Sequence, residues 1–137
     1  MPLPQTVQCA VEGRVARVTL DRPPLHILDL PTLEQYAAAL DRVSRESGVV
    51  VCILSATGDK AFSTGVDIKD HTPDRVGAML VGFHNVIRKV RSLECVTLAL
   101  VRGMALGGGF ELALACDIII AEEDATLGVP ETWLGCF

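Results

Sequence analysis

The chain has 137 residues, of which 50% are hydrophobic, 21% charged and 4% aromatic. This is the composition of a globular protein with an aliphatic core, and the length favours a single domain, residues 1–137, over two domains. Lys and Arg total 12 against 17 Asp and Glu, a net charge of −5, which argues against a nucleic-acid partner because no basic surface is left for the phosphate backbone.

Three elements are predicted in the first part of the chain. Apolar residues alternate across residues 7–20 on both sides of a Gly-containing break, which indicates a β-hairpin. Apolar residues at helical spacing in residues 33–43 predict an amphipathic helix, with Pro31 in its first turn and Gly48 past its end. The apolar run 49–54 predicts a strand that is buried on both faces.

The second part of the chain continues the alternation of strands and helices. We expect a polar connection 59–70, a helix from Pro73 to about Leu93 with Thr72 as N-cap, a strand 97–101, a glycine-rich stretch 103–109, a short helix 108–116 and a strand 118–121. This order predicts an α/β fold with mainly parallel strand pairing. The chain ends on apolar residues just after a helix-start signal at Pro130, so we expect that a C-terminal part is missing.

The cysteines and the N-terminus favour a cytoplasmic location. The five cysteines are odd in number, scattered and never in Cys-x-x-Cys spacing, which favours a reducing compartment; they are Cys9, Cys52, Cys95, Cys116 and Cys136. The first eight residues lack a basic segment followed by an apolar stretch, and no apolar run is long enough to span a bilayer. We therefore expect no membrane partner.

A glycine cluster is the strongest local signal. Residues 103–111, Gly-Met-Ala-Leu-Gly-Gly-Gly-Phe-Glu, lie between a predicted strand and a predicted helix. A dinucleotide fingerprint would need glycine or alanine where Leu112 stands, and a P-loop would need lysine where Gly109 stands. Two interpretations stay open: tight packing of strand on helix, or an anion site formed by main-chain N–H groups at the helix start.

A second glycine-bearing turn, residues 62–69, follows the apolar strand 49–54. Ligands of open α/β sheets usually bind at the carboxyl ends of the strands. If both turns aim N–H groups at one point, they form a two-donor oxyanion hole, which is worth about 3 kcal/mol per donor to a reaction that develops charge on a carbonyl oxygen.

Two glutamates are unusual in their surroundings. Glu111 lies in an otherwise apolar helix, and Glu131 directly follows Pro130 in an apolar stretch. Carboxylates are rarely buried without a partner or a function. The alternative interpretations are that Glu111 faces solvent and that Glu131 is a first-turn acid favoured by the helix dipole.

Taken together, these motifs resemble the enoyl-CoA hydratase/isomerase (crotonase) family. The segments are F-S-x-G-x-D-I-K (62–69), A-L-G-G-G-x-E-L-A-L-A-C-D-I-I-I-A (105–121) and G-V-P-E (128–131). The resemblance covers the first half of a typical member, from about Val7 to Phe137. It implies a crotonase-like ββα spiral core whose C-terminal part, used in the family for trimer assembly and for closing the acyl-CoA site, is missing.

The resemblance also implies roles for single residues. The N–H groups of Val66 and Gly108 match the oxyanion hole that holds the thioester carbonyl. The segment that lines the CoA site is matched by Val66, Asp67, Ile68 and Lys69. Glu111 and Glu131 match the two carboxylates that hold a water molecule, activate its attack on the β-carbon and protonate the α-carbon.

The implied activity is hydration of an α,β-unsaturated acyl-CoA, a lyase reaction of fatty-acid or aromatic degradation. Coenzyme A is then part of the substrate, no metal or redox cofactor is needed, and the complete protein is expected to be a homotrimer or hexamer. Adding water to a conjugated thioester needs an acid, a base and a stabilised enolate, in agreement with the residues present. The alternatives are an enoyl-CoA isomerase, an acyl-CoA hydrolase, or a non-catalytic CoA-binding or oligomerising fragment.

A finer resemblance concerns residues 22–29, Arg-Pro-Pro-Leu-His-Ile-Leu-Asp, which together with the last four residues are similar to cyclohexa-1,5-diene-1-carbonyl-CoA hydratases. His26 departs from the asparagine common at that place. It is either a loop histidine with one local hydrogen bond or a contact to CoA.

Several reactive residue types are not assigned a function. His26, His71 and His84 have no second ligand at a metal spacing, so no metal site is predicted. Cys52 and Cys116 have no base nearby in the sequence and are expected to fill the core rather than to act as nucleophiles.

Overall fold

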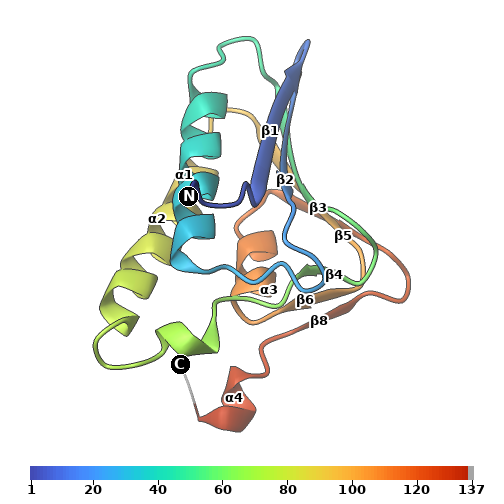
Figure 1. Ribbon diagram of the computed structural model, residues 1–137. Coiled ribbons are helices and arrows are strands. Elements are labelled where there is room, and N and C mark those ends of the chain that lie inside the picture. Colours follow the sequence, from blue (N-terminus) through green and yellow to red (C-terminus); the bar gives the residue numbers. More distant parts are fainter. Residues whose placement is uncertain (136–137) are drawn as a thin grey trace.

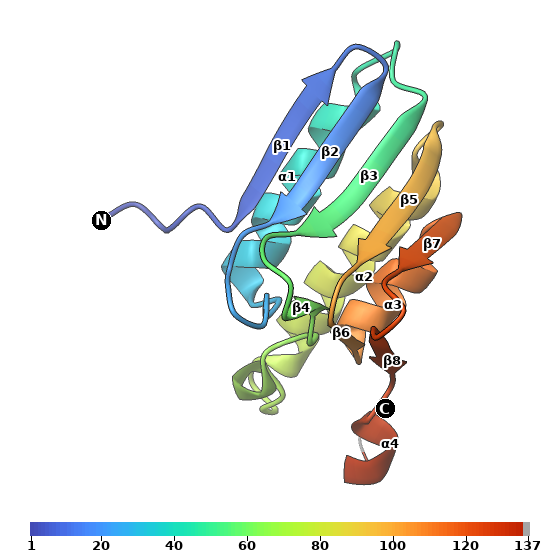
Figure 2. The same cartoon turned by 90° about the vertical axis from the view of Figure 1, so that its right-hand side faces the viewer.

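Two sheets and a layer of helices make up the molecule, and the computed structural model describes residues 1–135 (Figure 1). The elements are β1 (Val7–Glu12), β2 (Val15–Leu20), α1 (Leu30–Ser44), β3 (Val51–Ala56), β4 (Ala61–Ser63), η1 (Ile68–Asp70), α2 (Val76–Ser92), β5 (Val96–Val101), β6 (Met104–Leu106), α3 (Gly108–Leu114), β7 (Ile118–Ala121), β8 (Thr126–Gly128) and α4 (Glu131–Leu134). The larger sheet has the order β1-β2-β3-β5-β7 and the smaller one β4-β6-β8. Helices α1, α2 and α3 cover one face of the larger sheet (Figure 2).

One unit recurs along the chain: a strand of the larger sheet, a strand of the smaller sheet, then a helix. The units are β3-β4-α2, β5-β6-α3 and β7-β8-α4, and their strands pair in parallel. The smaller sheet lies at the carboxyl ends of the larger sheet's parallel strands (Figure 2). The expected α/β fold with a ββα spiral is confirmed.

The first elements form where the sequence predicts them. Strands β1 and β2 pair antiparallel as the expected hairpin. Helix α1 begins after Asp29, whose side chain accepts a hydrogen bond from the Thr32 amide, and Pro31 lies in its first turn. The helix ends at Ser44, before Gly48, as expected.

Strand β3 corrects one prediction. Cys52 and Leu54 are fully buried against the helices, but Ile53 between them is only half-buried. The expectation of a strand buried on both faces is therefore wrong. The reason is that α1, α2 and α3 cover a single face of the larger sheet (Figure 2).

Helix α2 begins later than expected. It starts at Val76 rather than at Pro73, and Arg75 occupies the N-cap position without a side-chain cap. The Thr72 carbonyl accepts hydrogen bonds from the Arg75 and Val76 amides. Thr72 therefore closes a turn before the helix and is not its N-cap.

The smaller sheet was not predicted. Strands β4 and β6 lie inside the segments expected to be a polar connection and a glycine-rich stretch. Each strand of this sheet has 3 residues, which is too short to show an alternating pattern. The consequence for function is direct, because both glycine-bearing turns leave this sheet.

Candidate active site

The first turn of the site follows β4 and contains Gly65. Its φ of +98° lies in the left-handed region, and a Cβ at this position would lie 2.9 Å from the Gly108 amide nitrogen. The Gly65 carbonyl accepts a hydrogen bond of 2.9 Å from the Leu28 amide. A side chain at residue 65 would therefore push apart the two turns that the sequence predicts to act together.

The second turn leads from β6 into α3. Gly107 has a φ of +55° and donates a hydrogen bond of 2.9 Å to the Gly128 carbonyl. A Cβ on Gly108 would lie 3.5 Å from the Val66 amide nitrogen and 3.2 Å from the Phe83 ring. The structure thus brings Val66 and Gly108 together. Among residues 1–135, neither of their N–H groups donates a hydrogen bond to the protein.

Ser63 connects these turns to the loop that contains His26. Its hydroxyl donates to the His26 carbonyl at 2.8 Å and accepts from the Gly65 amide at 3.1 Å. A Cβ on Gly109 would lie 2.0 Å from the Ser63 carbonyl oxygen. We call this set of residues (His26, Ser63, Gly65, Val66, Gly108, Gly109) the donor half of the site.

The structure decides between the two interpretations of His26 in favour of local hydrogen bonding. Its side chain is 1% exposed. Nδ1 accepts a hydrogen bond from the Arg22 amide at 3.1 Å, so Nε2, 2.8 Å from the Thr57 carbonyl, is the donor. Burial lowers the pKa of the imidazole, against the opposing effect of Thr57. His26 is a neutral structural histidine that fixes the loop over Ser63.

Glu111 and Glu131 line one cavity of about 370 Å³ together with Val66 and Gly108. Glu111 is exposed on α3, so the prediction that it faces solvent is confirmed. The same residue also lines the cavity. Partial burial raises the pKa of Glu111, the charge of Glu131 raises it further, and His84 lowers it. Both carboxyl groups thus belong to one cavity.

Glu131 is held against the glycine cluster. A Cβ on Gly107 would lie 1.9 Å from Glu131 Oε1, so a side chain at residue 107 would displace the carboxyl group from this position. Glu131 Oε2 is buried and has no hydrogen-bond partner in the part of the chain that the structure describes. We call Glu111, Glu131 and the α2 residue His84 the acid half of the site.

Sequence reasoning missed the wall of the cavity formed by α2. Phe83 and His84 line it, as does His71 from the turn after η1. These histidines show no metal-ligand spacing, so the sequence predicts no site that contains them. The signal that could have identified His84 is its position on the same helix face as Val76 and Leu80.

The segment expected to line the CoA site is only partly at this cavity. Val66 lines it, but Asp67, Ile68 and Lys69 are not among the lining residues. The Asp67 side chain instead caps η1 by accepting a hydrogen bond of 3.0 Å from the Lys69 amide, and Ile68 is 79% exposed. Their role in binding CoA stays a prediction.

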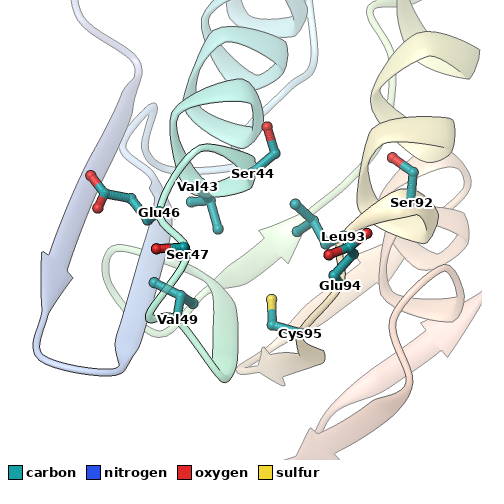
Figure 3. A pocket seen from close by; sticks show the side chains of 9 residues that line it. All are labelled: Val43, Ser44, Glu46, Ser47, Val49, Ser92, Leu93, Glu94 and Cys95. Carbon is teal, nitrogen blue, oxygen red and sulfur yellow. The ribbon is translucent and has the colours of Figure 1, made fainter.

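A second cavity, of about 250 Å³, lies between the C-terminal ends of α1 and α2 (Figure 3). Its lining includes Glu46, Glu94 and Cys95, next to the starts of β3 and β5 and so away from the carboxyl ends of the strands. Burial raises the pKa of the Cys95 thiol. Burial also raises the pKa of Cys52 and of Cys116 to about 12 each, as expected for thiols that fill the core.

Within residues 1–135, no group of three or more His, Cys, Asp or Glu side chains could hold a metal ion. No helix in the same range is both long and apolar enough to cross a membrane.

Comparison with known proteins gives one family. The family model described as enoyl-CoA hydratase/isomerase matches residues 10–137. The short-chain-enoyl-CoA hydratase of Clostridium acetobutylicum is 38% identical over 129 residues, which are 90% of this chain and 49% of that protein. The cyclohexa-1,5-dienecarbonyl-CoA hydratase of Thauera aromatica is 32% identical over 126 residues, which are 92% of this chain and 48% of that protein.

Solved structures agree with the sequence relatives. An enoyl-CoA hydratase/carnithine racemase from Magnetospirillum magneticum superposes with a TM-score of 0.91 at 30% identity, covering 98% of this chain and 53% of that one. The enoyl-CoA hydratase of Bacillus anthracis gives a TM-score of 0.89 at 33% identity, covering 95% and 52%. The chain spans about half the length of the curated relatives it matches.

Proposed function

Since the chain belongs to the enoyl-CoA hydratase/isomerase family, we propose that the full-length protein adds water to the double bond of an α,β-unsaturated acyl-CoA thioester. Glu111 and Glu131 serve as acid and base, and the Val66 and Gly108 N–H groups form the oxyanion hole. The observation that carries this proposal is that one cavity is lined by both carboxyl groups and by both of these residues.

The donor half supports stabilisation of an enolate. Attack on the β-carbon moves charge to the thioester oxygen, and two preorganised N–H groups lower the energy of that charge without reorganisation. The Val66 and Gly108 amides lie beside each other and have no protein acceptor within residues 1–135. Loss of one such donor typically lowers kcat by about 100-fold to 1000-fold.

The acid half supports transfer of one shared proton. Both carboxyl groups line one cavity, and burial and then the charge of Glu131 raise the pKa of Glu111. In the proposed step one of the two carboxyl groups is protonated and the other is ionised. The ionised group takes a proton from water as its oxygen bonds to the β-carbon, and the protonated group gives a proton to the α-carbon. The balance is the addition of one water molecule.

The acyl group is linear or a cyclic diene. The 38% sequence identity with a short-chain-enoyl-CoA hydratase supports a linear acyl group. The 32% sequence identity with a cyclohexa-1,5-dienecarbonyl-CoA hydratase supports a cyclic one. We retain Asp67, Ile68 and Lys69 as the segment that contacts CoA. The proposed reaction needs no metal or redox cofactor, and we propose a homotrimer or hexamer in the cytoplasm as its working form.

A mass-spectrometric assay tests the proposal. The full-length protein is given crotonyl-CoA and cyclohexa-1,5-diene-1-carbonyl-CoA in separate reactions. We expect a product heavier by one water molecule from at least one of them. A product of unchanged mass would indicate an isomerase, and release of free CoA a hydrolase. Binding of both thioesters without any product would replace the proposal by a CoA-binding module.

A further inference from the structure

The loop of residues 22–29 lies against the backbone that leads to Val66. Three hydrogen bonds join the two segments, and they run from the Thr64 amide to the Leu25 carbonyl (3.0 Å), from the Ser63 hydroxyl to the His26 carbonyl (2.8 Å) and from the Leu28 amide to the Gly65 carbonyl (2.9 Å). Leu28 also forms an isolated parallel β-bridge with Val66. The direction of the Val66 N–H therefore depends on where this loop lies, and we call residues 22–29 the backing loop.

The side chain of Arg22 connects the two ends of the backing loop. Its Nη1 donates a hydrogen bond of 2.9 Å to the Ile27 carbonyl, and its Nη2 lies 3.0 Å from Asp29 Oδ2 in an ion pair. The other carboxylate oxygen of Asp29 accepts a hydrogen bond of 3.0 Å from the Thr32 amide and so caps α1. The planar guanidinium offers several N–H donors in a fixed geometry, which suits two acceptors at once. Arg22 therefore fixes the backing loop to the start of α1.

We propose that Arg22 is a positioning residue of the oxyanion hole: its guanidinium fixes the backing loop and thereby the direction of the Val66 N–H. The inference deepens the proposed hydration and rests on it, because this N–H matters for rate only where charge develops on a thioester oxygen. Arg22 does not line the active-site cavity, so it acts through the backbone. A misplacement of about 1 Å can lower a rate by about 100-fold, so partial loss of this support should lower kcat by roughly tenfold.

Amide hydrogen exchange in the unliganded full-length protein tests the structural step. In Arg22→Gln, the Thr64 and Leu28 amides should exchange roughly tenfold faster than in the wild type, because the hydrogen bonds that protect them lose their support. Arg22→Lys keeps the charge without the two-donor geometry and should give an intermediate rate. Arg42→Gln is the matched control, since Arg42 Nη1 also donates a hydrogen bond of 2.9 Å to a carbonyl, that of Cys9, but joins α1 to β1. It should leave both exchange rates unchanged.

Infrared spectra of a bound thioester test the effect on the oxyanion hole. Butyryl-CoA labelled with ¹³C at its carbonyl carbon has no double bond to hydrate, so its carbonyl stretching frequency is measured at equilibrium. Hydrogen bonds to the oxygen lower this frequency, and we expect a smaller lowering in Arg22→Gln than in the wild type or Arg42→Gln. With crotonyl-CoA, kcat of Arg22→Gln should fall roughly tenfold while KM changes by less than about twofold, because the N–H donors act mainly on the transition state.

The two measurements separate the possible failures. Unchanged exchange of the Thr64 and Leu28 amides in Arg22→Gln would overturn the inference, whether or not the protein is a hydratase. Faster exchange with a wild-type carbonyl frequency would also overturn it, because the backing loop would then not set the oxyanion hole. Faster exchange and a smaller lowering of the frequency in a protein that hydrates neither crotonyl-CoA nor the cyclic dienoyl-CoA would sustain the positioning role and refute the proposed function. No lowering in the wild type would overturn both.

Discussion

The donor half and the acid half of the site are built in different ways. In the donor half, Ser63 is fully buried and His26 is 1% exposed, and hydrogen bonds and glycine contacts fix every segment. In the acid half, Glu111 is exposed, and Trp133 near Glu131 is 90% exposed. The comparison teaches that packing sets the geometry of the N–H donors, whereas the Glu111 carboxyl group lies at an open surface, where partial burial and the charges of Glu131 and His84 all act on its pKa.

The largest effect is expected where the donor half is most crowded. Gly109→Ala places a Cβ 2.0 Å from the Ser63 carbonyl oxygen, so α3 must move and we expect a loss of about 3 kcal/mol of stability together with the activity. Gly77→Ala is the matched control, since a Cβ there meets nothing within 4 Å. It should stabilise α2 by about 0.5–1 kcal/mol. Thermal unfolding of both variants checks this. Equal unfolding midpoints would contradict the claim that close packing fixes the donor half.

Ser63→Ala is expected to have the next largest effect. It removes the hydroxyl that joins the His26 carbonyl to the Gly65 amide, which should lower stability by about 2 kcal/mol and kcat by roughly tenfold. Thr64→Val is the control, because the Thr64 hydroxyl makes one long bond of 3.4 Å to the Leu25 carbonyl. Denaturant unfolding and steady-state kinetics should show a smaller change in Thr64→Val. A larger loss of stability and kcat in Thr64→Val than in Ser63→Ala would show that Ser63 does not hold the donor half together.

The stability of the donor half should also depend on pH through His26. Burial lowers its pKa below the ordinary value of 6.5, so folding favours the neutral ring. This contribution is complete above the ordinary pKa and is lost progressively as the pH falls from there to the lowered pKa of the folded state, because a protonated Nδ1 cannot accept from the Arg22 amide.

The variant His26→Asn isolates this contribution. Asn suits the left-handed φ of +50° at this position but lacks the titrating ring. At neutral pH it should be about 1 kcal/mol less stable than the wild type. The difference should narrow as the pH falls below about 6.5. A constant difference between pH values in urea unfolding would show that His26 does not titrate with folding.

The smallest effect is expected at a surface ion pair whose residues do not line the active-site cavity. Lys89 of α2 pairs with Asp41 of α1, and both side chains are partly exposed. Asp41→Asn should lower stability by at most about 0.5 kcal/mol and leave kcat unchanged. Urea midpoints at low and high salt check this. If Asp41→Asn lost as much stability as Ser63→Ala, the buried hydrogen bonds of the donor half would contribute no more to stability than a surface ion pair.

Much of the larger sheet and its helices could be predicted from sequence. The hairpin, α1, β5 and β7 follow hydrophobic periodicity, which needs several residues to appear. The strands of the smaller sheet were missed because 3 residues show no period. The face exposed by Ile53 was misjudged because a run of apolar residues does not reveal how many layers cover a strand.

The sequence predicts those parts of the site whose chemistry depends on residue type alone. The glycine cluster and the two glutamates could be named from the sequence, because glycine allows close approach and carboxylates are rare in apolar surroundings. That Gly65 meets Gly108 depends on the pairing of β4 with β6, which no local pattern reveals. His84 was missed because its only signal, a place on the same helix face as Val76 and Leu80, does not show that this face lines a cavity until the neighbouring elements are placed.

The most direct test of the account is kcat for hydration in the full-length protein and its variants Glu111→Gln, Glu131→Gln and the double variant. Each single change keeps the side-chain shape and should lower kcat by roughly 100-fold to 10,000-fold, with unfolding midpoints close to the wild type. The double variant should be little worse than either single one, because the two carboxyl groups act as a unit. Near wild-type kcat in either single variant would contradict the two-glutamate mechanism.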